Sequence, residues 1–355
     1  MSIVSYLYAF VVGVDTHARN HVYSIITTTG HRVDDREFPT TAKGLSRALD
    51  WVARRTGGDL STLWVIEGIG TYGALLADQV TEAGYRVVEA ARMSAKDRNG
   101  VGKNDHIDAH RIAATVLPLD ETELRSPRDS HGTRRALQIL VKARDSMTKD
   151  RTRTVNALTA VLRSHDLGID ARRSLSRAKV AVIAKWRSRT EPVEVLEARR
   201  EAVRLARRVR ELDAEITDYA KRIRDLVAQS PARRLLAEPG IGPITAAVFF
   251  LAWSHPGRIH SEAGFAKLAG ANPIPASSGN TVRFRLNRGG DRRLNSALYM
   301  VIITRLSHDD HTRKYLRTRM SENKTKKEVI RSLKRYLARR VYRILESGHP
   351  IENAA

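Results

Sequence analysis

The stretch that decides the fold of the first part of the chain is YAFVVGV (residues 8–14), an unbroken run of apolar residues and glycine that ends at Asp15. Such a run predicts a buried β-strand. HVYSIITT (21–28) predicts a second strand. A Gly-His turn at 30–31 follows, and the weak alternation at 32–38 predicts a third strand. Because the links are short, we expect an antiparallel meander.

Helical and strand patterns alternate after the meander. Apolar residues at helical spacing predict helices, and short apolar runs predict buried strands. In chain order these are a helix at 41–55, a strand at 63–68, a helix at 72–83 and a strand at 85–90. The order β-β-β-α-β-α-β is that of an RNase H-like fold, a mixed sheet with helices on its faces. Another helix is predicted at 104–117, with Asn104 or Asp105 as its N-cap.

Much of the rest of the chain has the pattern of charged and apolar residues that is typical of long helices. Residues 131–230 hold 24 basic and 13 acidic residues, with Leu, Val and Ala at helical spacing. This pattern is typical of helices that pair or mediate dimerisation, although a solvated helix face explains any single arginine equally well. Residues 231–300 are richer in Gly, Pro and apolar residues, and residues 294–345 are again helical and basic. We expect an α/β domain at 8–125, a helical, coiled-coil region for assembly and nucleic-acid binding at 131–230, and a mainly α-helical domain at 231–345.

Charge is distributed unevenly along the chain. The net charge is +23, from 62 Lys and Arg against 39 Asp and Glu. Residues 1–130 carry a net charge of −2, whereas residues 131–355 carry +25. The second part therefore suits a polyanionic partner. A basic surface can also serve solubility, but the excess here is mostly arginine, whose planar fork matches phosphate oxygens.

The composition excludes several classes of site. The chain has no cysteine, which excludes disulfides, cysteine-ligated metals and a thiol nucleophile. No run approaches 18 apolar residues, so we expect no membrane span. The start MSIVSYLYAF lacks the basic segment of a secretory signal. We expect a cytoplasmic protein.

Four carboxylates stand out by position. Asp15 follows the first predicted strand and Glu67 the fourth; these strands are neighbours in an RNase H-like sheet. Asp105 and Asp108 are three residues apart on one predicted helix and share a face. Clustered carboxylates repel one another unless a cation lies between them, and oxygen ligands favour Mg²⁺ or Mn²⁺. Each acid alone also fits a turn or a helix cap. His17 and His106 are expected beside the acids or on the surface rather than as ligands.

Two further segments carry candidate nucleic-acid chemistry. PGIGPITA (239–246) has the form of a helix-hairpin-helix, in which Gly240 and Gly242 would expose N–H groups to a DNA phosphate; a plain turn between helices is the alternative. Ser277 and Ser278 precede a dense set of arginines, namely Arg283, Arg285, Arg288, Arg292 and Arg293. A serine hydroxyl is a weak nucleophile by itself, and no histidine base adjoins it, so chemistry alone favours a turn residue here. The arginines could stabilise charge on a phosphate under attack.

Taken together, these motifs resemble the DEDD-type insertion-sequence transposases that work with a bridge RNA. The resemblance spans about residues 10–345. The matching segments are VVGVDTHARNHVYSII (11–26), WVIEGIGTYGALLADQV (64–80), KNDHIDAHRIA (103–113), LLAEPGIGPITAAVFF (235–250), GFAKLAGANPIPASSG (264–279) and LNRGGDRRLNSALY (286–299).

The resemblance implies more than the residues do. It implies a RuvC-like first domain whose tetrad Asp15, Glu67, Asp105 and Asp108 binds Mg²⁺, and a C-terminal transposase domain whose catalytic serine precedes a glycine, which points to Ser278 rather than Ser277. It also implies a covalent phosphoserine link to DNA, donor and target DNA as substrates, a structured guide RNA, a homo-oligomer up to a tetramer, and a bacterial or archaeal setting near the nucleoid.

Two other interpretations stay open at this point. A RuvC-like, metal-dependent junction nuclease with a structural serine explains the tetrad and the basic surface, but not the long C-terminal part. In a non-enzymatic nucleic-acid-binding protein, the carboxylates would be caps.

Overall fold

The computed structural model describes residues 2–90, 105–129, 131–276 and 284–347. The chain forms two compact units, Met1–Ser130 and His131–Ala355. Ser277, Ser278 and Arg283 lie outside the described residues, as does Asn104.

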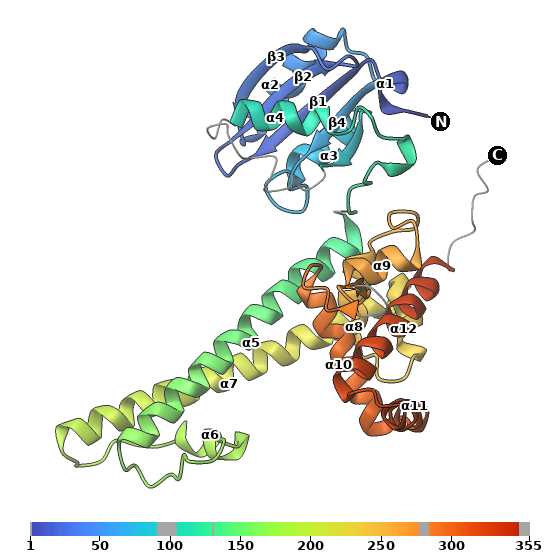
Figure 1. Ribbon diagram of the computed structural model, residues 1–355. Helices are drawn as coiled ribbons and strands as arrows, with labels where there is room; N and C mark the ends of the chain where they lie inside the picture. Colours follow the sequence, from blue (N-terminus) through green and yellow to red (C-terminus); the bar gives the residue numbers. More distant parts are fainter. Residues whose placement is uncertain (1, 91–104, 130, 277–283, 348–355) are drawn as a thin grey trace. The chain divides into compact units, whose positions relative to one another are not determined.

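The first unit is built on a five-stranded mixed sheet (Figure 1). Its strands are β1 (Phe10–Thr16), β2 (Asn20–Thr27), β3 (Arg32–Pro39), β4 (Thr62–Ile66) and β5 (Arg86–Glu89), in the spatial order β3-β2-β1-β4-β5. β1, β2 and β3 pair antiparallel, whereas β4 and β5 run parallel to β1. The predicted meander and mixed α/β sheet are confirmed.

One boundary matters for the site. The sequence places Asp15 after the first strand, and this is wrong by two residues. β1 continues to Thr16 because its antiparallel pairing with β2 continues to Thr16 opposite His21. Asp15 therefore sits inside the strand, opposite Val22.

Helices cover both faces of the sheet. They are α1 (Val4–Leu7), α2 (Ala42–Thr56), α3 (Ala74–Glu82) and α4 (Asp105–Ala114), with a short 3₁₀ turn, η2, at Glu121–Glu123. Successive strand residues point to opposite faces, so Val12 packs towards α2 and α3, and Val11 towards α4. The Thr41 hydroxyl accepts the Gly44 N–H to start α2. Each helix is thus fixed on its own side of the sheet.

α4 lies unusually close to β1. A Cβ on Gly13 would come within 2.1 Å of the Ala109 carbonyl oxygen and 2.6 Å of the Ala113 nitrogen. Only a glycine in β1 allows this approach, which holds the acidic first turn of α4 against the sheet.

The second unit begins with two long helices that run side by side in opposite directions (Figure 1). They are α5 (Gly132–Ser164) and α7 (Val193–Ala228), with the short α6 (Arg177–Ile183) packed against α7. The prediction of long paired helices is confirmed. Apolar residues between them gather in two places: Leu158, Leu162 and Ile183 belong to one buried cluster, and Leu137, Val141 and Ile223 to another.

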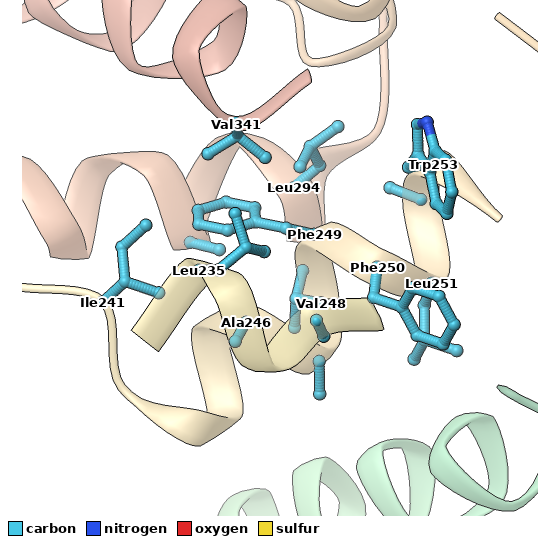
Figure 2. Close-up of a cluster of buried hydrophobic side chains, with 14 of the residues drawn as sticks. Leu235, Ile241, Ala246, Val248, Phe249, Phe250, Leu251, Trp253, Leu294 and Val341 are labelled. Atoms are coloured by element: carbon cyan, nitrogen blue, oxygen red, sulfur yellow. The ribbon is translucent and has the colours of Figure 1, made fainter. Parts of the chain in front are cut away.

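The remaining elements surround α8 (Pro243–Trp253). They are η3 (Pro231–Ala237), α9 (Glu262–Leu268), β6 (Ile274–Pro275), β7 (Phe284–Arg285), α10 (Arg292–His308), α11 (Asp310–Ser321) and α12 (Lys326–Glu346). α8 is apolar on all sides, and its Phe249 ring lies among Leu235, Leu294 and Val341 (Figure 2). The short helix before the Pro-Gly turn is a 3₁₀ helix. None of the described helices is long and apolar enough to cross a membrane.

Candidate metal centre and nucleic-acid interface

The sheet brings Asp15 and Glu67 to one edge. β1 and β4 are parallel neighbours with Val14 opposite Ile66, and Glu67 directly follows β4. The Glu67 N–H donates to the Val14 carbonyl at 3.0 Å, and the Thr16 hydroxyl donates to the Glu67 carbonyl at 2.9 Å. The expected proximity of these two strand ends is therefore present.

The first turn of α4 adds Asp105 and Asp108 to this edge. His17 lies between two of the acids: its Nε2 is 3.2 Å from Asp15 Oδ2 and 3.4 Å from Asp105 Oδ2. One potential ligand atom from each of Asp15, His17 and Asp105 lies within 4.8 Å of the others. The structure thus brings two of the four predicted acids into a tight group. Glu67 and Asp108 lie outside that group, and Glu67 is exposed.

The other three acids nevertheless act electrostatically on Asp15. Asp15 is buried, and burial is the main cause that raises its pKa. His17 lowers that pKa, and the carboxylates of Glu67, Asp105 and Asp108 raise it further. Asp108 also contacts Arg111, with Oδ1 3.8 Å from Nη1. The ionised form of Asp15 is thus unfavourable in the folded chain, as expected for a side chain that a cation would stabilise.

Sequence reasoning did not place His17 among the ligands. The signal that points to it is its spacing, because residues two apart at a strand end lie on the same side of the sheet and Asp15 and His17 are two apart. His21, on β2, is buried, and its Nδ1 accepts the His17 backbone N–H at 3.3 Å. Burial lowers the pKa of His21, although hydrogen bonds to the backbone of Asn20 and Tyr72 act in the other direction.

The donor set fits a divalent cation. Two carboxylates and an imidazole converge, and further carboxylates lie close enough to influence them. The His17 Nε2 atom is buried and makes no hydrogen bond within the described part of the chain, despite its two nearby oxygens. Oxygen ligands suit Mg²⁺ and Mn²⁺, and a nitrogen ligand suits first-row transition ions.

The Pro-Gly turn is held firmly in the second unit. Gly240 has a φ of +74°, and a Cβ there would lie 3.2 Å from the Val301 carbonyl of α10. Arg305 Nε donates to the Pro239 carbonyl at 2.7 Å. The Gly242 N–H donates to the Thr245 hydroxyl at 3.0 Å, so this N–H already has a partner inside the chain.

The predicted arginines differ in their surroundings. Arg285, Arg288 and Arg292 are exposed. Arg293 instead forms an ion pair with Asp145 of α5 and joins α10 to that helix. The described residues on either side of 277–283 are joined, since β6 pairs with β7 and Asn287 donates to Asn272 Oδ1 at 2.6 Å.

A groove of about 530 Å³ lies beside α7. It is lined mainly by arginines, with Trp186 and a few other side chains: Arg187, Ser188, Leu196, Arg199, Arg200, Val203, Arg204, Arg207, Arg208 and Glu211. The Arg199 guanidinium stacks over the Trp186 ring at 4.9 Å and pairs with Glu191. The groove combines cationic and aromatic groups, as nucleic-acid-binding surfaces do.

Comparison with known proteins agrees with this arrangement. A family model for the DEDD domain of IS110-type proteins, described as "Transposase", matches residues 12–165. A second model, described as "Transposase IS116/IS110/IS902 family", matches residues 232–317. The two models cover more than half of the chain between them.

The chain belongs to the IS110-type transposases. The insertion element IS110 uncharacterized 43.6 kDa protein of Streptomyces coelicolor is 24% identical over 95% of this chain and 94% of its own length. The putative transposase y4pF/y4sB of Sinorhizobium fredii is 25% identical over 91% of this chain and 82% of its own. This IS110-type transposase therefore matches its relatives over most of their length.

Proposed function

We propose that this transposase cuts and rejoins donor and target DNA by a metal-dependent reaction in which Ser278 is the nucleophile. The observation that carries the proposal is the convergence of Asp15 and Asp105, with Glu67 and Asp108 near enough to raise the pKa of Asp15. The strand order β3-β2-β1-β4-β5 supports a RuvC-like assignment for the first domain. In this proposal Asp15, Glu67, Asp105 and Asp108 hold Mg²⁺ or Mn²⁺, which supplies charge stabilisation at a phosphodiester.

The chemistry assigned to the serine balances as a transesterification. The Ser278 Oγ forms a bond to phosphorus, the bond from phosphorus to the leaving DNA oxygen breaks, and the serine proton passes to that oxygen. In the second step a DNA hydroxyl attacks the phosphoserine and restores the serine. The exposed Arg285 and Arg288, which follow Ser278 in the sequence, are assigned to offset the phosphate charge.

The remaining parts are assigned to nucleic-acid holding and assembly. Gly240, Arg283 and Arg292 are assigned to contact with DNA. The two other predicted groups, the Gly242 N–H and Arg293, are already bonded inside the chain to Thr245 and Asp145. The helical region 131–230 is assigned to oligomer assembly, in a dimer or tetramer, and to nucleic-acid binding. Sequence choice is assigned to a structured bridge RNA, because a guided enzyme needs protein groups that hold backbones more than groups that read bases. The excess of basic residues after residue 130 supports this division, and a place beside the nucleoid follows from it.

The test compares Ser278→Ala with Ser277→Ala in a recombination assay with donor DNA, target DNA and the RNA encoded beside the gene. We expect Ser278→Ala to lose both the protein–DNA adduct and the joined product, and Ser277→Ala to keep both. Joined product at the wild-type rate from Ser278→Ala would contradict the serine role. Free hydrolysed ends without an adduct would instead identify a junction nuclease, and retained activity in a metal chelator would remove the metal.

A further inference from the structure

The side chain of His17 is placed as a ligand rather than as a neighbour of the site. Its Nε2 lies 3.2 Å from one carboxylate and 3.4 Å from another, and these come from β1 and α4. Although 39% of the imidazole is exposed, the Nε2 atom is buried and makes no hydrogen bond to any residue that the structure describes. A buried nitrogen that lies within ion-pair distance of two carboxylates from different elements is placed where a metal ligand would be.

The backbone holds His17 in this position. It lies at the start of the link between β1 and β2, and its N–H donates to Nδ1 of the buried His21. Since that Nδ1 accepts a hydrogen bond, His21 carries its proton on Nε2. The fixed backbone at residue 17 limits the side chain to the side of the sheet that Asp15 faces.

We propose that His17 Nε2 is a direct ligand of the cation held by Asp15 and Asp105, and that it makes this site prefer Mn²⁺ to Mg²⁺. The proposal rests on the metal-dependent function proposed above. Mg²⁺ is bound almost entirely through oxygen, whereas imidazole suits first-row transition ions. Replacement of an oxygen ligand by an imidazole therefore shifts the preference of a carboxylate site from Mg²⁺ towards Mn²⁺.

The experiment uses the full chain loaded with Mn²⁺ and pulsed electron paramagnetic resonance, which detects ¹⁴N coupled to the bound ion. We expect a directly coordinated nitrogen in the wild type, its loss in His17→Gln, and its retention in His31→Gln, because His31 is an exposed turn residue. We also expect Mn²⁺ affinity to fall about tenfold in His17→Gln, as when a metal site loses a supporting group.

A second variant keeps the test informative if His17→Gln loses the ion completely. His17→Asp supplies an oxygen at the same position, so it is expected to bind Mn²⁺ without nitrogen coupling and to require about tenfold less Mg²⁺ for displacement of Mn²⁺ than the wild type does. Circular dichroism checks that each variant is folded.

The outcomes separate this inference from the function on which it rests. Bound Mn²⁺ with no nitrogen coupling in the wild type, or with coupling that persists in His17→Gln, overturns the role of His17 and leaves the metal-dependent function standing. A folded wild-type chain that binds no Mn²⁺ overturns both.

Discussion

The backbone of Gly13 lies directly against that of Ala109, so that a Cβ at residue 13 would be 2.1 Å from the Ala109 carbonyl oxygen. Gly13 is two residues before Asp15, and Ala109 directly follows Asp108. This close approach therefore sets the distance between the strand that carries one acid and the helix that carries two others.

Substitution of Gly13 by alanine should damage the site through packing alone. The added Cβ would clash with two backbone atoms of α4, the Ala109 oxygen and the Ala113 nitrogen, so the helix has to move away. We expect the free energy of unfolding to fall by about 1–3 kcal/mol and Mn²⁺ binding to weaken. Denaturant unfolding and metal titration measure the two effects. Gly70→Ala is the matched control, because nothing lies within 4 Å of its added Cβ. Equal behaviour of the two variants would show that α4 does not depend on this approach.

The substitution Asp15→Asn should raise the stability of the metal-free protein while it removes recombination activity. Burial and the nearby carboxylates make the ionised Asp15 unfavourable, so a neutral amide relieves repulsion. We expect the melting temperature of the metal-free first unit to rise by about 4 °C, the shift that about 1 kcal/mol produces in a domain of its size. The wild type should gain stability on addition of Mg²⁺ or Mn²⁺, and the variant should not. A less stable metal-free variant would mean that the acids are not held in repulsion.

The second unit should become less stable in acid through Glu262. Arg343 and Arg339 on α12 hold the pKa of Glu262 at about 2, from an ordinary value of 4.5. A lowered pKa in the folded state stabilises the fold above pH 4.5, and this contribution disappears as the pH falls towards 2. We expect Glu262→Gln to cost only about 1 kcal/mol at pH 7, because the ion pairs are partly exposed. The variant should also lose less stability than the wild type as the pH falls, because the carboxyl group that titrates is gone.

Urea unfolding between pH 7 and pH 3 tests this prediction. Glu322→Gln is the control, since Glu322 pairs only locally with Arg319 on an exposed surface. An acid limb that is unchanged in Glu262→Gln would contradict the role of the α9–α12 ion pairs.

The groove beside α7 should contribute to nucleic-acid affinity. We expect the double substitution of Arg200 and Arg204 by alanine to weaken binding of a short RNA or DNA duplex and to lower the salt dependence of log K by about 0.9 for each phosphate that the variant no longer neutralises. Fluorescence anisotropy at several salt concentrations measures both. The same change at Arg222 and Arg224, exposed residues of α7 outside the groove lining, should have the smaller effect. A smaller effect of the groove pair would exclude the groove as a binding surface.

The pattern of apolar residues, in short runs or at helical spacing, predicted the sheet and most helices, because burial leaves a regular trace in the sequence. Three features could be found only in the folded structure. His17 meets Asp105 only because β1 and α4 pack together. Arg293 looks like its arginine neighbours in sequence, but it pairs with Asp145 from a distant helix. Residues 231–237 have apolar spacing that fits either helix type, and they form a 3₁₀ helix. Neither these long-range pairings nor the choice between helix types leaves a signal in the spacing of apolar residues.

The paired helices α5 and α7 have a polar midsection with mechanical consequences. Within the fully described α5, no residue between Val141 and Leu158 is buried, and Arg151 pairs there with Asp213 at 2.6 Å. The apolar clusters at the two ends are thus joined by continuous helix about 50 Å long, and few buried side chains hold its middle part in place. We therefore expect the helix pair to bend first at this polar midsection, with the distal apolar cluster moving as one piece.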